Sequence, residues 1–298
     1  MCSIGTPVKV LYVVGSGHSG STLLDIALGH HPEIASHGEL ANLPRGGWIA
    51  NHYCSCGRRA NDCPFWREVR RRWLKRAGVD GAESYAELQN TFERYRRWPR
   101  LLLERLRPSS QFRAYAEHTR ALLETMREVS GKPIIVDSSK EPARAFALAM
   151  VPGVDLRLVH LVRDGRGVAM SLNRKNHPVW RTAVIWTMTN LASEWTLRRL
   201  GPGKSVRIRY ESFVTNPKAA LSEIGKMIRV DLTKVAHTLT VGNGVEVGHI
   251  IAGNRLRKSK SVRLRPDAGD WRSTFSTGKQ RLFWALAGWL VRRYGYKR

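Results

Sequence analysis

The sequence predicts an α/β fold in three layers, with a central parallel sheet flanked by helices and a basic helical insertion. Two observations predict it. Short apolar runs alternate with helical patterns along the chain, and the first run leads through a glycine-rich turn into a helix. Parallel strands that are covered on both faces have such nearly continuous apolar runs. We expect one domain over residues 1–298, because this length suits a single large core.

The first strand, turn and helix carry a phosphate-binding pattern. The apolar strand VKVLYVV at 8–14 is followed by GSGHSGST at 15–22 and by the helical segment LLDIALGHH. Gly15 and Gly20 have the spacing of a loop whose backbone N–H groups and following helix N-terminus hold an anion. Ser21 stands where a nucleoside triphosphatase needs Lys, which disfavours ATP chemistry. A nucleotide kinase or NTPase is the alternative on this evidence alone.

The later strands follow the same apolar pattern. We expect them in the segments KPIIVD from about residue 133, DLRLVHLV at 155–162 and SVRIRY at 205–210. Helices are predicted at about 140–150, from Asp164 onward, from Trp180 to Trp195, and at about 279–294. Residues 36–63 and 240–278 lack a regular apolar period and are rich in Gly, Pro or basic residues, so we expect loops there.

Positive charge is the unusual feature of the composition. Fifty Lys and Arg stand against 24 Asp and Glu, a formal net charge of +26, which favours anionic partners. Residues 64–130 are helical and very basic, and we expect them to form a helical insertion. Arginines between 67 and 113 alternate with aromatics, which would suit a nucleic-acid-binding protein. Those aromatics fall at helical spacing and favour a core, so we expect no nucleic-acid partner.

The location of the protein follows from what the sequence does not contain. We see neither a signal-peptide pattern nor an apolar run of about 18 residues, and we expect a cytoplasmic protein. The segment FWALAGWLVRRYGYKR at 283–298 suggests either a core helix with a basic end or peripheral contact with an anionic membrane. The oligomeric state stays open.

A second motif, LVRDGRGVAMSL at 161–172, opens a helix directly after a strand. Arg163 directly follows the carboxyl end of that strand, which is the place where open α/β sheets bind ligands. Ser171 lies about two helical turns further on, and helical side chains lean toward the N-terminus. The two side chains can therefore meet on one phosphate. The alternative is a surface ion pair between Arg163 and Asp164, with Ser171 as a packing residue.

With both motifs in order, the chain resembles the sulfotransferases that use 3′-phosphoadenosine-5′-phosphosulfate (PAPS). The 5′-phosphosulfate loop of that family has the form K/R-S-G-T/S-T/S, similar to HSGST at 18–22. Its 3′-phosphate motif has an Arg and, eight residues later, a Ser, similar to Arg163 and Ser171. Four weaker similarities keep the family's order, namely VDSSK at 136–140, RYESFVTNP at 209–217, HIIAGNRLR at 249–257 and GDWRSTFS at 269–276.

The resemblance implies a P-loop-type fold and a transfer of sulfonate from PAPS to a hydroxyl or amine by in-line displacement. The acceptor would be a small molecule or glycan, such as a carbohydrate, a glycolipid or another small metabolite. We expect the insertion at 64–130 on the acceptor side, because nothing in it resembles the nucleotide motifs. No metal is required in this scheme, because arginines, backbone amides and a helix dipole can stabilise the transferred charge. The implied nucleotide contacts are Gly17, His18, Ser19, Gly20, Ser21, Thr22, Arg163, Ser171 and Arg257. Trp271 either stacks on the adenine or belongs to the core.

Three residues are the candidates for catalysis. His18 stands where most members of the family have Lys or Arg, and we hypothesise an imidazolium that stabilises the departing bridging oxygen. Lys140, at the end of VDSSK, could share that role. Glu39 resembles the glutamate base of several members, with a local cap or salt bridge as the alternative. His31, His37 and His160 are weaker candidates for the base.

A cluster of cysteines lies in the first predicted loop. His52, Cys54, Cys56 and Cys63 offer three thiols and an imidazole within twelve positions, so a structural zinc is one interpretation. The C-x-C spacing is tighter than the usual C-x₂₋₄-C, and a disulfide with a spare thiol is the other. The sequence does not decide between them.

Overall fold

The computed structural model describes residues 6–264 and 271–298. Its central sheet has five parallel strands in the order β2-β3-β1-β4-β5. The strands are β1 (Val8–Val14), β2 (Ile34–Ser36), β3 (Ile134–Lys140), β4 (Val154–Val162) and β5 (Ser205–Arg209). The predicted parallel α/β sheet is confirmed. Residues 269 and 270 of the GDWRSTFS segment lie outside the described residues.

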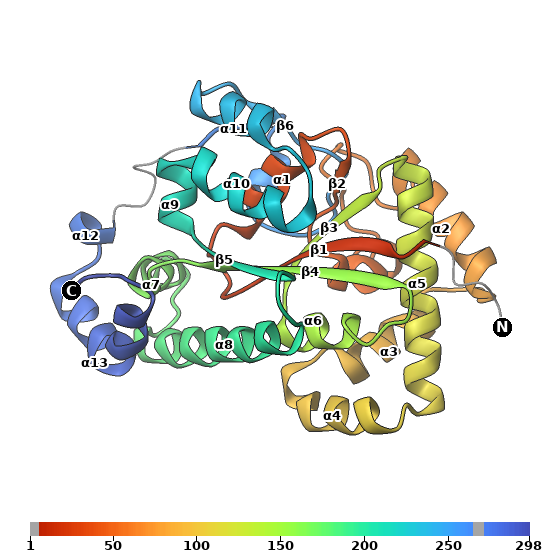
Figure 1. Cartoon of the computed structure of the whole chain (residues 1–298), viewed down its shortest axis with the longest axis horizontal. Helices are drawn as coiled ribbons and strands as arrows, with labels where there is room; N and C mark the ends of the chain where they lie inside the picture. The colour runs from red at the N-terminus through yellow and green to blue at the C-terminus, as the bar shows by residue number, and fades with distance from the viewer. Residues whose placement is uncertain (1–5, 265–270) are drawn as a thin grey trace.

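Helices cover both faces of the sheet, because successive side chains of a strand point to opposite faces. Leu11 and Val13 of β1 join one core cluster, to which α1 (Ser21–Gly29), α9 (Tyr210–Thr215), α10 (Pro217–Ile228) and α11 (Thr233–Thr240) contribute. Val10 and Tyr12 join a second cluster on the other face, which includes residues of α6 (Pro142–Leu148). Figure 1 shows α1 and α10 above the sheet and α6 below it. The three-layer arrangement is confirmed.

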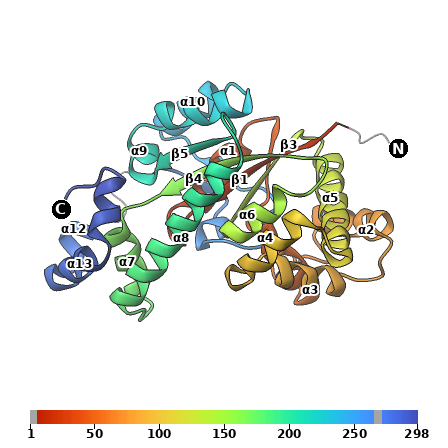
Figure 2. The ribbon, with the colours of Figure 1, turned by 60° about the horizontal axis from the view of Figure 1, so that its bottom comes forward.

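The basic segment from residue 64 to 130 is helical, as predicted. It forms α2 (Pro64–Ala77), α3 (Glu83–Phe92), α4 (Trp98–Leu106) and α5 (Ser110–Ser130), with the short η3 (Tyr95–Arg97) before α4. These helices lie together at one end of the molecule (Figure 2). Trp66 and Trp73 are fully buried in the same cluster as the sheet residues, and the Trp73 indole donates to the His118 carbonyl at 3.1 Å. The aromatics Trp66 and Trp73 are thus core residues and not exposed stacking platforms.

A third cluster forms at the other end of the sheet. It joins α7 (Gly165–Asn173), α8 (Val179–Arg199), α12 (Trp271–Thr274) and α13 (Thr277–Arg293), with Trp186 and Phe283 fully buried. Trp271 belongs to this cluster and lies against the Arg166 guanidinium, 4.1 Å from its ring centroid. Of the two interpretations for Trp271, the structure supports the core residue.

The predicted loops contain short regular elements. β2 lies just before the first predicted loop and shares its last residue with it; η1 (Leu40–Asn42) and η2 (Leu43–Ile49) follow within the loop. The second contains η4 (Arg255–Lys258) and a two-stranded antiparallel ribbon of β6 (Val245–Glu246) and β7 (Ser261–Val262). Strands of two or three residues are too short to show a period of two, which is why the sequence did not reveal them.

Candidate active site

The carboxyl ends of four neighbouring strands meet at one edge of the sheet, where open α/β sheets place their ligands. β1 leads into the glycine-rich loop, and β3 ends at Lys140, which pairs with Val14 at the end of β1. β4 is followed by Arg163, and β2 is followed by the loop that carries Glu39. Residues that are far apart in sequence thus reach one edge because of the strand order alone.

Two glycines of the loop are required by the backbone and by close neighbours. Gly15 has φ 145° and Gly20 has φ 90°, which side chains rarely adopt. A Cβ at Gly20 would overlap the ring of Tyr210, and one at Gly15 would overlap the carbonyl of Leu161. Ser19 Oγ donates to the Ser16 carbonyl at 2.6 Å, inside the turn. The loop therefore brings backbone N–H groups and the start of α1 together in an arrangement suited to an anion.

Gly17 is the open position of this loop. It is exposed, and a Cβ placed on it would meet nothing within 4 Å. Ser21 and Thr22 begin α1 and are buried, and Thr22 Oγ1 accepts from the N–H of Asn254 at 3.1 Å. The late basic loop is therefore attached to the first turn of α1.

The two predicted anion-binding motifs touch each other. Arg163 Nη1 donates to the carbonyl oxygen of His18 at 3.0 Å, and Ser171 Oγ lies 3.0 Å from His18 Nδ1. The Arg163 guanidinium also lies over the Tyr210 ring, 4.6 Å from its centroid. One nucleotide can therefore reach both motifs. Tyr210 was not singled out from the sequence, although it lies in the family-like segment RYESFVTNP.

The alternative ion pair between Arg163 and Asp164 is wrong. Asp164 caps α7, accepting from the N–H of Arg166 at 2.9 Å, and it bridges the Arg166 guanidinium at 2.8 Å. Both side chains are buried. Because Asp164 is paired with Arg166, the charge of Arg163 is not neutralised by its neighbour in sequence.

The protonation state of His18 in this structure differs from the imidazolium that its predicted role requires. Its backbone has φ 63°, in the left-handed region, and its side chain is half-buried. Burial and the cationic neighbours Lys175, Arg163 and Lys140 lower the pKa of His18 below the usual 6.5. Without a bound anion, the structure thus favours a neutral imidazole, and the hypothesised imidazolium would need the charge of a bound phosphosulfate.

Glu39 and Lys140 form an ion pair at the same edge. Lys140 Nζ donates to one Glu39 carboxylate oxygen and, at 3.1 Å, to the Ser138 carbonyl. The second Glu39 oxygen accepts from Asn42 Nδ2 at 2.8 Å. Both charged side chains are largely buried, with exposed fractions of 18% and 19%. Glu39 therefore does form a salt bridge, but with Lys140, another predicted catalytic residue that is distant in sequence, and not with a near neighbour in the chain.

A polar cavity of about 160 Å³ opens beside this ion pair. The insertion supplies one wall through α3 and the residues after it, and the ends of β2 and β3 supply the other. Its lining includes Glu39, Asn42, Arg45, Gln89, Asn90, Glu93, Arg94, Ser139, Lys140 and Glu141. The 64–130 insertion thus lies beside the predicted catalytic residues Glu39 and Lys140.

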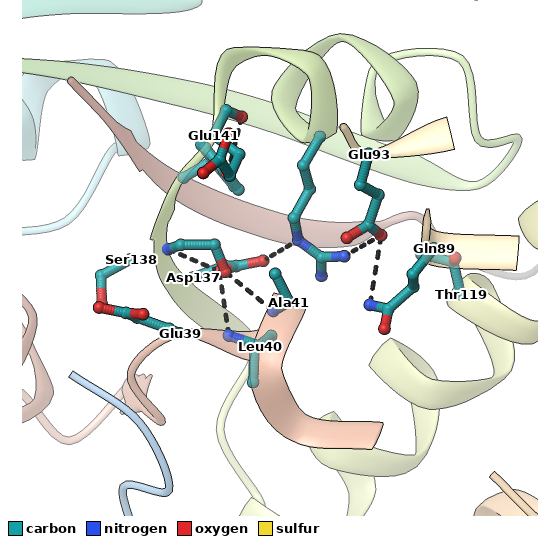
Figure 3. Close-up of polar contacts among 12 residues, drawn as sticks. Glu39, Leu40, Ala41, Gln89, Glu93, Thr119, Asp137, Ser138 and Glu141 are labelled. Carbon is teal, nitrogen blue, oxygen red and sulfur yellow. Dashed lines mark hydrogen bonds and ion pairs between the residues drawn. The ribbon is translucent and has the colours of Figure 1, made fainter. Parts of the chain in front are cut away.

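A buried charge network lies next to the cavity, which one of its members, Glu93, lines (Figure 3). Arg144 bridges Asp137 at 2.8 Å and also pairs with Glu93, and all three side chains are at most 5% exposed. Asp137 Oδ1 accepts from the N–H of Leu40 at 3.3 Å and of Ser139 at 3.0 Å. The network thus holds the backbone next to Glu39, at Leu40, and the backbone next to Lys140, at Ser139. The sequence showed no sign of it, because its members lie on separate elements.

Arg257, a predicted nucleotide contact, bonds to backbone carbonyl groups in this structure. Arg257 Nη1 donates to the carbonyls of Tyr53 at 2.9 Å and Ile250 at 3.3 Å, so it joins two loops in this structure.

The three candidate histidines have contacts within the protein. His31 Nδ1 accepts from the Glu33 N–H at 3.2 Å. His37 is buried against Phe65, and burial lowers the pKa of His37 to about 3. His160 is buried beside Asn190, and burial lowers its pKa to about 4. None of the three histidines is placed as a base.

Comparison with known proteins decides the family. The model of the sulfotransferase family matches residues 11–234, which span the glycine-rich loop, the insertion and the Arg163–Ser171 motif. The chain belongs to the sulfotransferase family. As a member, it is a transferase by family, and the resemblance to sulfotransferases seen in its motifs is confirmed.

Solved sulfotransferase structures share the fold at low sequence identity. The sulfotransferase domain from the olefin synthase of Synechococcus PCC 7002 has a TM-score of 0.55 and 19% identity, over 98% of this chain and 96% of that one. The sulfotransferase domain from the curacin biosynthetic pathway has a TM-score of 0.53 and 17% identity, over 98% and 99%. Sulfotransferase STF9 from Mycobacterium avium has a TM-score of 0.50 and 14% identity, over 98% and 78%. No curated protein sequence matches the chain.

Proposed function

We propose that this protein transfers a sulfonate group from PAPS to a hydroxyl, or an amine, of a small polar acceptor. The observation that carries the proposal is the contact between the two anion motifs, in which Arg163 and Ser171 both reach His18. A loop of this shape without the P-loop lysine suits a nucleotide with a 5′-phosphosulfate and a second anion, and it disfavours a nucleoside triphosphate.

Each end of the nucleotide has its own set of residues in this proposal. The backbone N–H groups of residues 17–22 and the start of α1 would hold the 5′-phosphosulfate. Arg163 and Ser171 would hold the 3′-phosphate, with Arg257 contributing from the late loop. An arginine on a phosphate forms charge-assisted, bidentate hydrogen bonds.

The reaction requires a base on one side of the sulfur and cations on the other. The acceptor oxygen attacks the sulfur in line while its proton moves to the Glu39 carboxylate. The bond between sulfur and the bridging oxygen breaks, and its electron pair stays on the 5′-phosphate of adenosine 3′,5′-bisphosphate. Lys140 and His18 would stabilise the charge that develops on this leaving oxygen. The ion pair of Glu39 with Lys140 holds both groups at one edge of the sheet, and the transferred sulfur would lie between the two when substrates bind.

The cavity indicates the chemistry of the acceptor. Its lining is dominated by amide, carboxylate and guanidinium groups from Asn42, Gln89, Asn90, Glu141 and Arg94. Such groups donate to and accept from hydroxyls, so a carbohydrate, a glycolipid headgroup or another polyhydroxyl metabolite fits better than an apolar one.

Adenosine 3′,5′-bisphosphate should raise the melting temperature, while ATP and AMP should not. A ligand at a hundred times its Kd stabilises the native state by about 2.7 kcal/mol, which corresponds to roughly 5 °C for a chain of this size. Arg163→Ala should weaken binding by roughly 10- to 100-fold, because it removes a charged hydrogen bond. A thermal-shift titration measures both effects.

Arg157→Ala is the matched control for that experiment. Arg157 lies near the start of β4, whereas Arg163 directly follows the end of that strand, and Arg157 pairs with Asp155 at 3.0 Å. It should leave nucleotide binding unchanged. Stabilisation by ATP with magnesium, and none by adenosine 3′,5′-bisphosphate, would favour the nucleotide kinase alternative.

We further propose that α8 and α13 make peripheral contact with an anionic membrane, where a lipid-linked acceptor would lie. No helix in residues 6–264 and 271–298 is long and apolar enough to cross a bilayer. However, α13 and α8 contact each other and expose large apolar side chains, namely Leu282, Leu286 and Trp289 on α13 and Trp180, Val184, Ile185 and Met188 on α8. Lys279, Arg281, Arg292 and Arg293 lie on the same α13 helix. Apolar side chains beside basic ones are typical of helices that rest on anionic lipid.

Leu286→Glu combined with Trp289→Glu should abolish co-sedimentation with vesicles that contain phosphatidylserine. The change places carboxylates where apolar side chains would enter the lipid, and it adds repulsion from anionic headgroups. Val241→Glu is the control, because Val241 is equally exposed but lies after α11. A dimer formed through the α8–α13 surface, detected by light scattering, would contradict the membrane proposal.

A further inference from the structure

Four side chains of the kinds that bind metals meet outside the proposed active site. Cys54, Cys56 and Cys63 come from the loop before α2, and His249 comes from the late basic loop. Their ligand atoms all lie within 4.8 Å of one another. His52, which the sequence suggested as the imidazole ligand, is exposed and does not belong to this group. The fourth ligand thus lies 186 residues after Cys63.

The distances within this group fit a tetrahedral metal site. Cys56 Sγ lies 3.7 Å from Cys63 Sγ, and His249 Nδ1 lies 3.2 Å from Cys63 Sγ and 3.8 Å from Cys54 Sγ. A tetrahedral zinc with the usual bond lengths separates two sulfurs by about 3.8 Å and a sulfur from a nitrogen by about 3.6 Å. Cys54, Cys56 and Cys63 are free thiols in this structure, and the sulfurs of Cys56 and Cys63 are much farther apart than the roughly 2 Å of a disulfide.

We propose that Cys54, Cys56, Cys63 and His249 bind a structural Zn²⁺ that joins the loop before α2 to the late basic loop. Three thiolates and one imidazole in a tetrahedral arrangement select zinc among the common divalent metals. Four protein ligands close the coordination sphere, so the metal takes no part in sulfonate transfer. His249 stacks on Phe65 of α2, with ring centroids 5.5 Å apart and planes within 7°, which orients the imidazole.

The metal would reinforce a set of hydrogen bonds between the same two loops. Ser55 donates its N–H to the Ile250 carbonyl at 2.9 Å, and Ser55 Oγ accepts from the Ile250 N–H at 2.8 Å. Arg257 donates to the Tyr53 carbonyl at 2.9 Å. The late loop then reaches α1, where the Asn254 N–H binds Thr22 Oγ1. Zinc would therefore hold the late loop against the glycine-rich loop, and this consequence rests on the proposed function.

Metal analysis of the full chain, purified without a histidine tag and dialysed, tests the site directly. We expect about one zinc per chain, released by a chelator together with a fall in melting temperature of more than about 5 °C. Cobalt in place of zinc should show the visible bands of tetrahedral cobalt and a thiolate charge-transfer band. Zinc-free wild-type protein, or a disulfide among Cys54, Cys56 and Cys63 in non-reduced peptide mapping, would overturn the proposal.

Two single variants separate the metal site from folding. Cys56→Ser changes an exposed thiol, so it should fold with a native circular dichroism spectrum but retain little zinc. His249→Ala should also lose zinc, whereas His52→Ala, the matched control, should retain it. Zinc retained by His249→Ala and lost from His52→Ala would show that the ligand set is wrong.

Nucleotide affinity tests the connection between the loops. In the zinc-free Cys56→Ser protein, we expect roughly tenfold weaker binding of adenosine 3′,5′-bisphosphate, because the late loop must then be ordered by the ligand. Unchanged affinity would overturn the connection and leave the zinc site standing. Zinc in a protein that does not bind this nucleotide at all would instead contradict the proposed function.

Discussion

Glu39→Gln should lower the rate of sulfonate transfer by about 10²- to 10⁴-fold, the usual contribution of a general base. The amide has nearly the same shape as the carboxylate but cannot take the proton of the acceptor. The Glu39 carboxylate lies in the cavity wall, and its hydrogen bonds to Lys140 and Asn42 hold it there. Since Glu39 is separate from the glycine-rich loop, the affinity for adenosine 3′,5′-bisphosphate should change little.

The rate can be measured as release of adenosine 3′,5′-bisphosphate from PAPS with a mixture of glycans as acceptors, and the affinity by calorimetry. Glu33→Gln is the matched control, because Glu33 lies in the same segment as Glu39, is exposed just before β2, and does not line the cavity. It should retain most of the activity. Equal and small effects of Glu39→Gln on rate and affinity would show that Glu39 only anchors Lys140.

Arg144→Ala should destabilise the fold by about 3–5 kcal/mol, which corresponds to a fall in melting temperature of roughly 5–9 °C. Arg144 is 1% exposed, and its removal would leave the carboxylates of Asp137 and Glu93 buried without their shared cation. Arg76→Ala is the matched control. Arg76 pairs with Glu128 at the surface, and its loss should cost about 1 kcal/mol or less.

The destabilisation by Arg144→Ala should depend on pH. Burial already raises the pKa of Glu93 to about 7, and the loss of Arg144 would raise it further. A carboxyl with a raised pKa in the folded state favours folding at low pH and opposes it as pH rises. The variant should therefore lose more stability, relative to wild type, at pH 8 than at pH 5. Urea unfolding at both values measures this difference, and an equal loss at both would show that the carboxylates are not the cause.

The alternation of strands and helices could be predicted from local pattern. The strand at 8–14 agrees with β1 at both ends, and the predicted strands at 155–162 and 205–210 agree with β4 and β5 within one residue. Burial on both faces of a parallel sheet requires apolar runs, and such runs are visible in the sequence. β2 was missed because its three residues are too few to show a pattern.

The sequence by itself determined the α/β fold, the glycine-rich loop and the Arg163–Ser171 motif, because each depends on residues close together in the chain. The tertiary structure alone decided which distant residues meet. In the folded chain, Glu39 pairs with Lys140. Arg144 pairs with both Asp137 and Glu93. His249, and not His52, lies with the three cysteines.

The physical reason lies in how these contacts form. Periodicity reports whether a residue is buried, but it does not report the residue against which it packs. The order β2-β3-β1-β4-β5 sets those partners, since it places the ends of distant segments at one edge of the sheet.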